Sequence, residues 1–195
     1  MATAATKPAA PTQRRFTVDE YHRMGEAGVF GENDRVELLD GHIYVMSPIG
    51  SEHAACVDRL TKLFVLHADE NAIVRVQSPV RLSEASEPEP DLALLAPRED
   101  NYAARHPRPD DVLLVVEVAD TSLPFDREVK RSLYAQAGIS ELWIVNLETD
   151  RIEVYRTPQD MEYTAEQRYE RDQSISLQCL PENAPIAVND VFGPQ

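Results

Sequence analysis

The run VLLVVEV at residues 112–118 constrains the fold of this chain more than any other part of its sequence. Its residues are apolar almost without a break, over a length that suits a strand. Such a run is typical of a central strand that is covered on both faces of a sheet. The exception within it is Glu117. An ionised carboxylate in a buried strand is costly unless a cation or another partner compensates it, so the run predicts an interior strand with a functional or paired glutamate.

The N-terminal half predicts a short helix, a hairpin and a long helix. The sequence TVDE at 17–20 has the spacing of a capping box, which opens a short helix. At 35–47, two apolar runs flank an Asp-Gly dipeptide, and this pattern predicts an antiparallel hairpin with a tight turn. From Ser51 to about Asn71, apolar residues recur at three- and four-residue steps, as in a helix with one buried face.

The middle of the chain predicts further strands and a second buried helix. Residues 73–82 look extended but are interrupted by Pro79, and an acidic, proline-rich loop then leads into the apolar run DLALLA at 91–96. Helical spacing returns at 126–138, where Gly138 is placed to end the helix.

The C-terminal third predicts a second hairpin and less regular structure beyond it. Its strands are ELWIVNL at 141–147 and RIEVYRT at 151–157. The remainder is polar, and we expect its short apolar pieces, ISLQCL and IAVNDVF, to close the sheet.

Length and composition indicate one globular domain. A chain of 195 residues with 43% apolar content is large enough for a full core, which we place at residues 15–195 after a flexible leader at 1–14. The leader has no apolar stretch that suits a signal peptide or a membrane span. Cys56 and Cys179 stand in unrelated surroundings, so we expect reduced thiols and a cytoplasmic protein.

The charge balance counts against nucleic acid as a partner. Nineteen basic and 34 acidic residues give a formal net charge of -15, which repels nucleic acid at long range. A site that binds divalent cations must itself be acidic, however, and the location of charge matters more than its sum.

Two carboxylates and a lysine stand where a sheet would gather them. Asp91 opens one apolar run, Glu117 ends another, and Lys130 lies on the predicted helix that follows. If the two strands pair, the carboxylates become neighbours, and the helix can bring the lysine back to them. Carboxylates hold hard divalent cations, and a lysine can stabilise the anionic transition state of phosphodiester hydrolysis or help to deprotonate water.

Each of these residues also has an ordinary interpretation. Asp91 after a proline is often a turn or strand-entry residue, Glu117 could be merely paired, and a lone helical lysine is usually solvated. Glu37 interrupts the first hairpin in the same way as Glu117, although strand alternation could aim it at water. His53 lies in the first turn of the long helix, where it could contact phosphate, but an exposed histidine is the commoner case. The carboxylates Glu87, Glu89 and Asp120 fit solvated loops.

The order of these segments resembles the bacterial Uma family of restriction endonuclease-like proteins. The similarity runs from FTVDEYHRM through RVELLDGHIYVMSP, EPEPDLALL and VYRTP to IAVNDVF, which is nearly the whole chain. Its most specific part is EVADTSLPFDREVK followed by LYAQAGISELWIVN. The resemblance implies an α/β (α+β) restriction endonuclease-like core of the PD-(D/E)XK superfamily, with a central mixed sheet flanked by helices and an N-terminal hairpin.

The resemblance also implies roles for individual residues. Asp91 corresponds to the motif aspartate and Glu117 to the motif glutamate, which together bind Mg²⁺, or Mn²⁺ in its place. Ala119 stands where the superfamily usually has lysine, and Lys130 on the next helix is its displaced equivalent. Glu37 resembles an early acidic residue of the family that can serve as a further ligand or orient water. Glu89 departs from the glutamine of many relatives.

Three functions remain open on these grounds. The first is a Mg²⁺-dependent DNA endonuclease that uses Asp91, Glu117, Lys130 and Glu37, and a homodimer would suit the cutting of both strands. The second is a nuclease-like binding module that no longer cuts, which the net charge favours. The third is a hydrolase of smaller phosphoesters, which needs a closed pocket. A basic rim for DNA could come from seven arginines, namely Arg75, Arg81, Arg98, Arg105, Arg108, Arg127 and Arg131.

Overall fold

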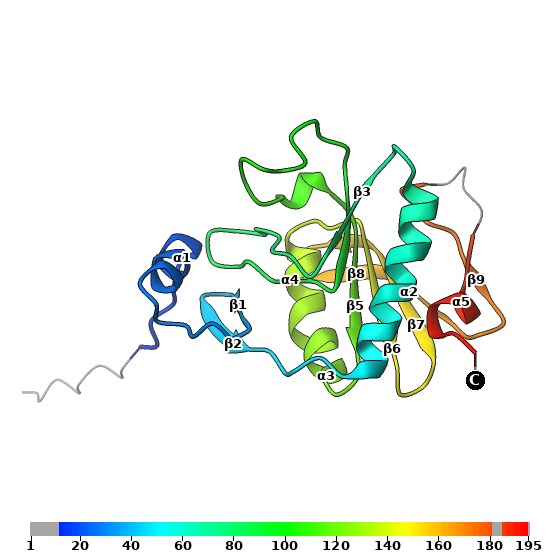
Figure 1. Cartoon of the computed structure of the whole chain (residues 1–195), viewed down its shortest axis with the longest axis horizontal. Helices are drawn as coiled ribbons and strands as arrows, with labels where there is room; N and C mark the ends of the chain where they lie inside the picture. The colour runs from blue at the N-terminus through cyan, green and yellow to red at the C-terminus, as the bar shows by residue number, and fades with distance from the viewer. Residues whose placement is uncertain (1–11, 181–184, 195) are drawn as a thin grey trace, which may run out of the picture.

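A mixed six-stranded sheet with helices packed on it forms the centre of the computed structural model, which describes residues 12–180 and 185–194 (Figure 1). The strand order is β3-β4-β5-β6-β7-β8; β5 and β6 run parallel, and the other neighbouring pairs run antiparallel. The predicted apolar run therefore forms an interior strand. In chain order the strands are β3 (Ile73–Val76), β4 (Leu92–Leu95), β5 (Val112–Ala119), β6 (Glu141–Asn146), β7 (Arg151–Gln159) and β8 (Glu162–Tyr169).

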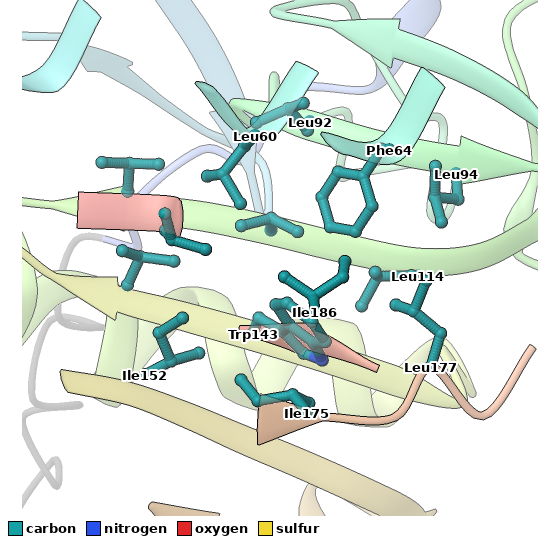
Figure 2. Close-up of a cluster of buried hydrophobic side chains, with 14 of the residues drawn as sticks. Leu60, Phe64, Leu92, Leu94, Leu114, Trp143, Ile152, Ile175, Leu177 and Ile186 are labelled. Atoms are coloured by element: carbon teal, nitrogen blue, oxygen red, sulfur yellow. The ribbon is translucent and has the colours of Figure 1, made fainter. Parts of the chain in front are cut away.

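One face of the sheet is covered by helix α2 (Ser51–Ala68), which confirms the predicted long helix. Leu60 and Phe64 of its apolar stripe are fully buried. Figure 2 shows these side chains pointing from α2 toward the strands, and the rings of Phe64 and Trp143 lie 5.7 Å apart. The C-terminal helix α5 (Val188–Phe192) extends the same core. This burial anchors α2 and so fixes the position of its N-terminal end.

The opposite face is covered by a helical segment that follows β5. It consists of a short turn α3 (Leu123–Phe125), a π-helical turn η2 (Asp126–Lys130) and helix α4 (Arg131–Gln136). Gly138 follows with a φ of 81°, a conformation that glycine adopts without strain, so the predicted helix end is confirmed. Tyr134 of α4 packs into a second core cluster on this face.

The N-terminal elements lie beside the central sheet, at the opposite end of the molecule from α5 and β9 (Figure 1). Helix α1 (Val18–Glu26) begins with the predicted capping box of Thr17 and Glu20. Strands β1 (Val36–Leu39) and β2 (His42–Val45) form the predicted hairpin as a separate two-stranded sheet. A single bridge between Leu38 and Glu87 joins β1 to the loop before β4.

The structure differs from the sequence expectations mainly in the C-terminal third. The predicted hairpin of β6 and β7 is confirmed, but β8 was not expected, and it forms an edge of the central sheet. The expectation that the last apolar pieces close this sheet is wrong. They pair with each other instead, as β9 (Ser174–Ile175) and β10 (Ile186–Ala187). A short 3-10 turn η1 (Pro109–Asp111) precedes β5.

The remaining expectations concern the leader, the thiols and the membrane. Most of the predicted leader at 1–14 lies outside the described residues. Cys56 and Cys179 are free thiols. Within the described part of the chain, no helix is long and apolar enough to cross a membrane.

Candidate active site

A cavity of about 320 Å³ lies where the first hairpin, the start of α2, the end of β5 and the π-helical turn meet. It brings together all four residues that the sequence singled out for catalysis. Asp91, Glu117, Lys130 and Glu37 line it together with His53 and Glu89. The outer lining includes the apolar residues Val45 and Ile49, both exposed.

Asp91 and Glu117 are neighbours because β4 and β5 pair, as the sequence predicts. The register places Leu92 opposite Val116, one residue from each carboxylate. The Asp91 carboxylate accepts hydrogen bonds from the Val118 amide at 2.8 Å and from the Gln77 side chain at 3.3 Å. The side chain is therefore fixed at the strand end and points into the cavity.

Lys130 reaches back from the helix to both neighbouring carboxylates. Its Nζ lies 3.2 Å and 3.3 Å from the two carboxylate oxygens of Glu117, and 3.2 Å from Oε2 of Glu37. The ordinary interpretation of Lys130 as a solvated lysine is wrong, since its side chain is only 7% exposed. Burial favours the neutral amine, but the charges of Glu117 and Glu37 outweigh it and raise the pKa of Lys130. The lysine therefore remains a cation at neutral pH.

The small side chain of Ala119 is consistent with this arrangement. Alternation along β5 puts Ala119 on the same face as Glu117, and Ala119 is fully buried in the core cluster that also contains Tyr134. A lysine side chain there would have to enter that packed core. The π-helical turn carries Lys130 at its last position, and such turns recur at functional sites. The ammonium group thus enters the cavity from the helix instead of the strand.

Glu117 is the most strongly perturbed carboxylate of the cavity. Burial raises its pKa well above the usual range, and the positive charge of Lys130 opposes this only in part. The hydroxyl of Tyr134 donates a 2.6 Å hydrogen bond to Oε1 of Glu117. Burial and the adjacent Glu117 charge raise the pKa of Tyr134, so its proton stays available for this bond. Glu117 is therefore oriented by two donors from one continuous helical segment, Lys130 at the end of η2 and Tyr134 in α4.

Glu37 is buried, so strand alternation does not aim it at water. Its Oε2 accepts a hydrogen bond from the backbone amide of Glu89 at 3.2 Å in addition to its contact with Lys130. Glu89 itself is partly buried, and burial raises its pKa. The expectation that Glu89 is a solvated loop carboxylate is therefore wrong. The same expectation is wrong for Glu87, which is 2% exposed.

His53 is not an exposed histidine but a partner of Asp91. Its Nε2 lies 3.1 Å from Oδ2 of Asp91, and its side chain is 16% exposed. The hydrogen bond to Asp91 raises the pKa of His53 against the opposing effect of burial. In turn, burial raises the pKa of Asp91, but the hydrogen bonds from His53 and Val118 outweigh it, so its pKa lies below the usual value.

Sequence reasoning missed two side chains of this site, Asp126 and Tyr134. Asp126 is buried, lines the cavity and accepts a 2.7 Å hydrogen bond from the Ser122 hydroxyl. Burial raises its pKa, with Lys130 opposing. Both residues stand four positions from Lys130, a spacing that puts them near one another on a helix. That four-residue spacing is the sequence signal that could have identified them as neighbours of Lys130.

The lining of the cavity is strongly acidic. It holds six carboxylates against two permanent cations, Arg35 and Lys130, and these carboxylates are Glu37, Glu89, Asp91, Glu117, Asp120 and Asp126. Mg²⁺ binds through one or two protein carboxylates and completes its shell with water and phosphate oxygens. Within the lining, Asp91 Oδ1 accepts only a long hydrogen bond from Gln77, and the charge of Lys130 compensates Glu117 only in part.

The seven arginines expected as a basic rim do not line this cavity. Three of them surround the buried Tyr102 ring at 5.2–5.8 Å from its centre, and these are Arg75, Arg98 and Arg105. Arg127 forms an ion pair with Glu153, and Arg131 lies over Tyr155. Positive charge at the cavity comes from Arg35 and Lys130 instead.

A mixed sheet flanked by helices, with two acids and a lysine in one cavity, is the arrangement of a restriction endonuclease-like protein. The Uma2 family model, described as "Putative restriction endonuclease", matches residues 18–189. The chain belongs to this family.

The fold is also similar to that of a solved structure. A putative nuclease of DUF820 from Anabaena variabilis matches with a TM-score of 0.73 and 15% sequence identity, over 91% of this chain and 97% of that one. No curated protein matches the chain.

Proposed function

We propose that this protein is a divalent-metal-dependent endonuclease that hydrolyses phosphodiester bonds of DNA. The observation that carries the proposal is the contact of the buried Lys130 ammonium with both Glu117 and Glu37, in a cavity that Asp91 also lines. Family membership and the nuclease-like fold support the reaction class. The lining holds six carboxylates against two permanent cations, an excess of negative charge that a bound divalent cation would reduce.

The residues divide into three roles. Asp91 and Glu117 would hold Mg²⁺, with Mn²⁺ as an alternative, and the bound ion would stabilise the charge that develops on phosphate oxygens. Lys130, held between the carboxylates of Glu117 and Glu37, would stabilise the attacked phosphate or the nucleophilic water with its positive charge. Glu37, held by Lys130 and the Glu89 amide, is placed to orient the attacking water.

His53 and Tyr134 act through the two metal-binding carboxylates. Each donates to one of them, His53 to Asp91 and Tyr134 to Glu117. Such partners fix the orientation of a ligand and tune its basicity. We assign both as positioning residues.

The test is cleavage of supercoiled plasmid and of single-stranded DNA during titration with Mg²⁺ or Mn²⁺. Wild type should cut with either ion, and Glu117→Gln should cut at least about 100-fold more slowly, since even partners of a metal ligand are worth 10–100-fold. Glu153→Gln is the matched control, because Glu153 is also a buried strand glutamate but lies outside the cavity.

Two outcomes would contradict the proposal. Equal cutting by wild type and Glu117→Gln would indicate a contaminant or a different site. Cutting by neither protein, with DNA retention in gel shifts, would favour the binding module without catalysis. The substrate choice, a homodimer and the cytoplasmic location stay predictions.

A further inference from the structure

A second group of metal-type ligands lies outside the cavity, in the N-terminal part of the molecule. His22 of α1, Glu87 before β4 and His106 before η1 each offer one ligand atom, and these atoms all lie within 4.8 Å of one another. None of the three lines the proposed nuclease cavity. They have no role in the hydrolysis described above, so their convergence needs a separate explanation.

Backbone hydrogen bonds hold the three segments together without an ion. The amide of Val18 donates to the Glu84 carbonyl at 2.8 Å, which joins the start of α1 to the loop that carries Glu87. The amide of Arg81 donates to the Pro107 carbonyl at 2.9 Å, which brings the His106 segment alongside. The group is therefore largely assembled before any ligand binds.

Glu87 is a buried carboxylate with a partner for only one of its two oxygens. Its side chain is 2% exposed, and its Oε1 lies 2.5 Å from Nε2 of His22. Its Oε2 is buried without a hydrogen-bond partner. A buried carboxylate oxygen that lacks a donor is costly, and a cation would satisfy it. His22 is 39% exposed and His106 is exposed, so an ion can enter from solvent.

We propose that His22, Glu87 and His106 bind a zinc ion. Two imidazole nitrogens and one carboxylate form a set that Zn²⁺ accepts, with a fourth position left to solvent. Mg²⁺ and Ca²⁺ prefer oxygen ligands, so the site discriminates against the ion of the nuclease cavity.

Zinc at this site would cross-link three segments of the chain. It would join α1 to the two loops that carry Glu87 and His106. The backbone amide of Glu87 also donates to the Leu38 carbonyl at 2.7 Å, next to Glu37 in β1. The ion would thereby stabilise the hairpin strand that presents Glu37 to the nuclease cavity.

The test measures zinc binding in the presence of excess Mg²⁺, which occupies sites built from oxygen. Chelator-treated protein is titrated with ZnCl₂, and the bound metal and the melting temperature are measured. Wild type should bind one more zinc per chain than the double variant His22→Ala/His106→Ala. At a free zinc concentration of 100 times the dissociation constant, zinc should raise the melting temperature of wild type by about 5–10 °C. His42→Ala is the control histidine outside the group.

Two further variants keep the test decisive. His106→Ala leaves the contact of His22 with Glu87 intact, so it should fold normally and yet bind zinc at least about 10-fold more weakly. Asp91→Asn/Glu117→Gln should retain the zinc and its stabilising effect. Equal zinc binding by wild type and the double histidine variant, or no binding by wild type, would overturn the proposal.

Discussion

Replacement of Lys130 by methionine tests the electrostatics of the cavity most sharply, because it keeps a long apolar side chain and removes the charge. The ammonium lies 3.2 Å from both Glu37 and Glu117. At an effective dielectric constant near 20, each contact is worth roughly 5 kcal/mol before desolvation is subtracted. Removal of one partner from a buried ion pair typically costs about 3–5 kcal/mol, because the remaining charge is left uncompensated.

The assay is urea unfolding at pH 7 without divalent cations. A loss of about 3–5 kcal/mol should lower the unfolding midpoint by roughly 1–2 M if the slope is unchanged. Addition of Glu37→Gln should recover part of the loss, since one of the two uncompensated carboxylates is then neutral. A midpoint for Lys130→Met within about 0.2 M of wild type would refute the buried ion-pair arrangement.

Three other predictions concern Tyr134, Glu153 and the charge of the cavity. Tyr134→Phe removes the 2.6 Å hydrogen bond to Glu117, so Mn²⁺ affinity or cleavage rate should fall about 10–100-fold. Tyr163→Phe removes a hydroxyl that lies outside the cavity and should change neither. Burial raises the pKa of Glu153, but its hydrogen bonds from guanidinium and phenol outweigh this and hold it below 4.5. In urea unfolding, Glu153→Gln should therefore be less stable than wild type above pH 4.5. The difference in unfolding free energy should disappear as the pH falls through the folded-state pKa of Glu153. Replacement of the exposed Glu166 by glutamine should show no such difference. DNA affinity in gel shifts should fall at least about 10-fold when Ca²⁺ is replaced by EDTA, because the cavity carries excess negative charge.

Each of these predictions has a contradicting result. Unchanged Mn²⁺ affinity in Tyr134→Phe would mean that the hydrogen bond to Glu117 does not support a metal ligand. A stability loss in Glu153→Gln that is equal at pH 7 and pH 3 would point to packing instead of charge. A DNA affinity that does not change with divalent cations at constant ionic strength would mean that DNA contacts the protein outside the cavity.

The parts of the fold that sequence predicted well are those with a local signal. The capping box at Thr17, the Asp-Gly turn of the first hairpin and the apolar stripe of α2 all form as expected. Strand β8 escaped prediction because most of its residues are exposed and polar at the sheet edge. The pairing of β9 with β10 was also not predicted, because a short apolar run does not reveal which strand it pairs with.

In the candidate site, too, the residues that were predicted had a local sequence signal and the others did not. Glu117 stood out because a charge interrupts an apolar run, and pairing of β4 with β5 supplied Asp91 as its neighbour. His53 and Glu87 gave no comparable signal. Their burial and contacts arise from segments far apart in sequence, such as α2 with β4 for His53 and α1 with the loop before β4 for Glu87.

The central claim is that Asp91 and Glu117 form the metal site that performs cleavage. The most direct measurement is Mn²⁺ binding and plasmid cleavage in the same preparations of wild type, Asp91→Asn, Glu117→Gln and His22→Ala/His106→Ala. In zinc-free preparations, we expect wild type and the histidine variant to bind Mn²⁺ and cut alike, and both carboxylate variants to lose the ion and the activity together. Mn²⁺ binding and cleavage that survive the loss of either carboxylate would contradict the account.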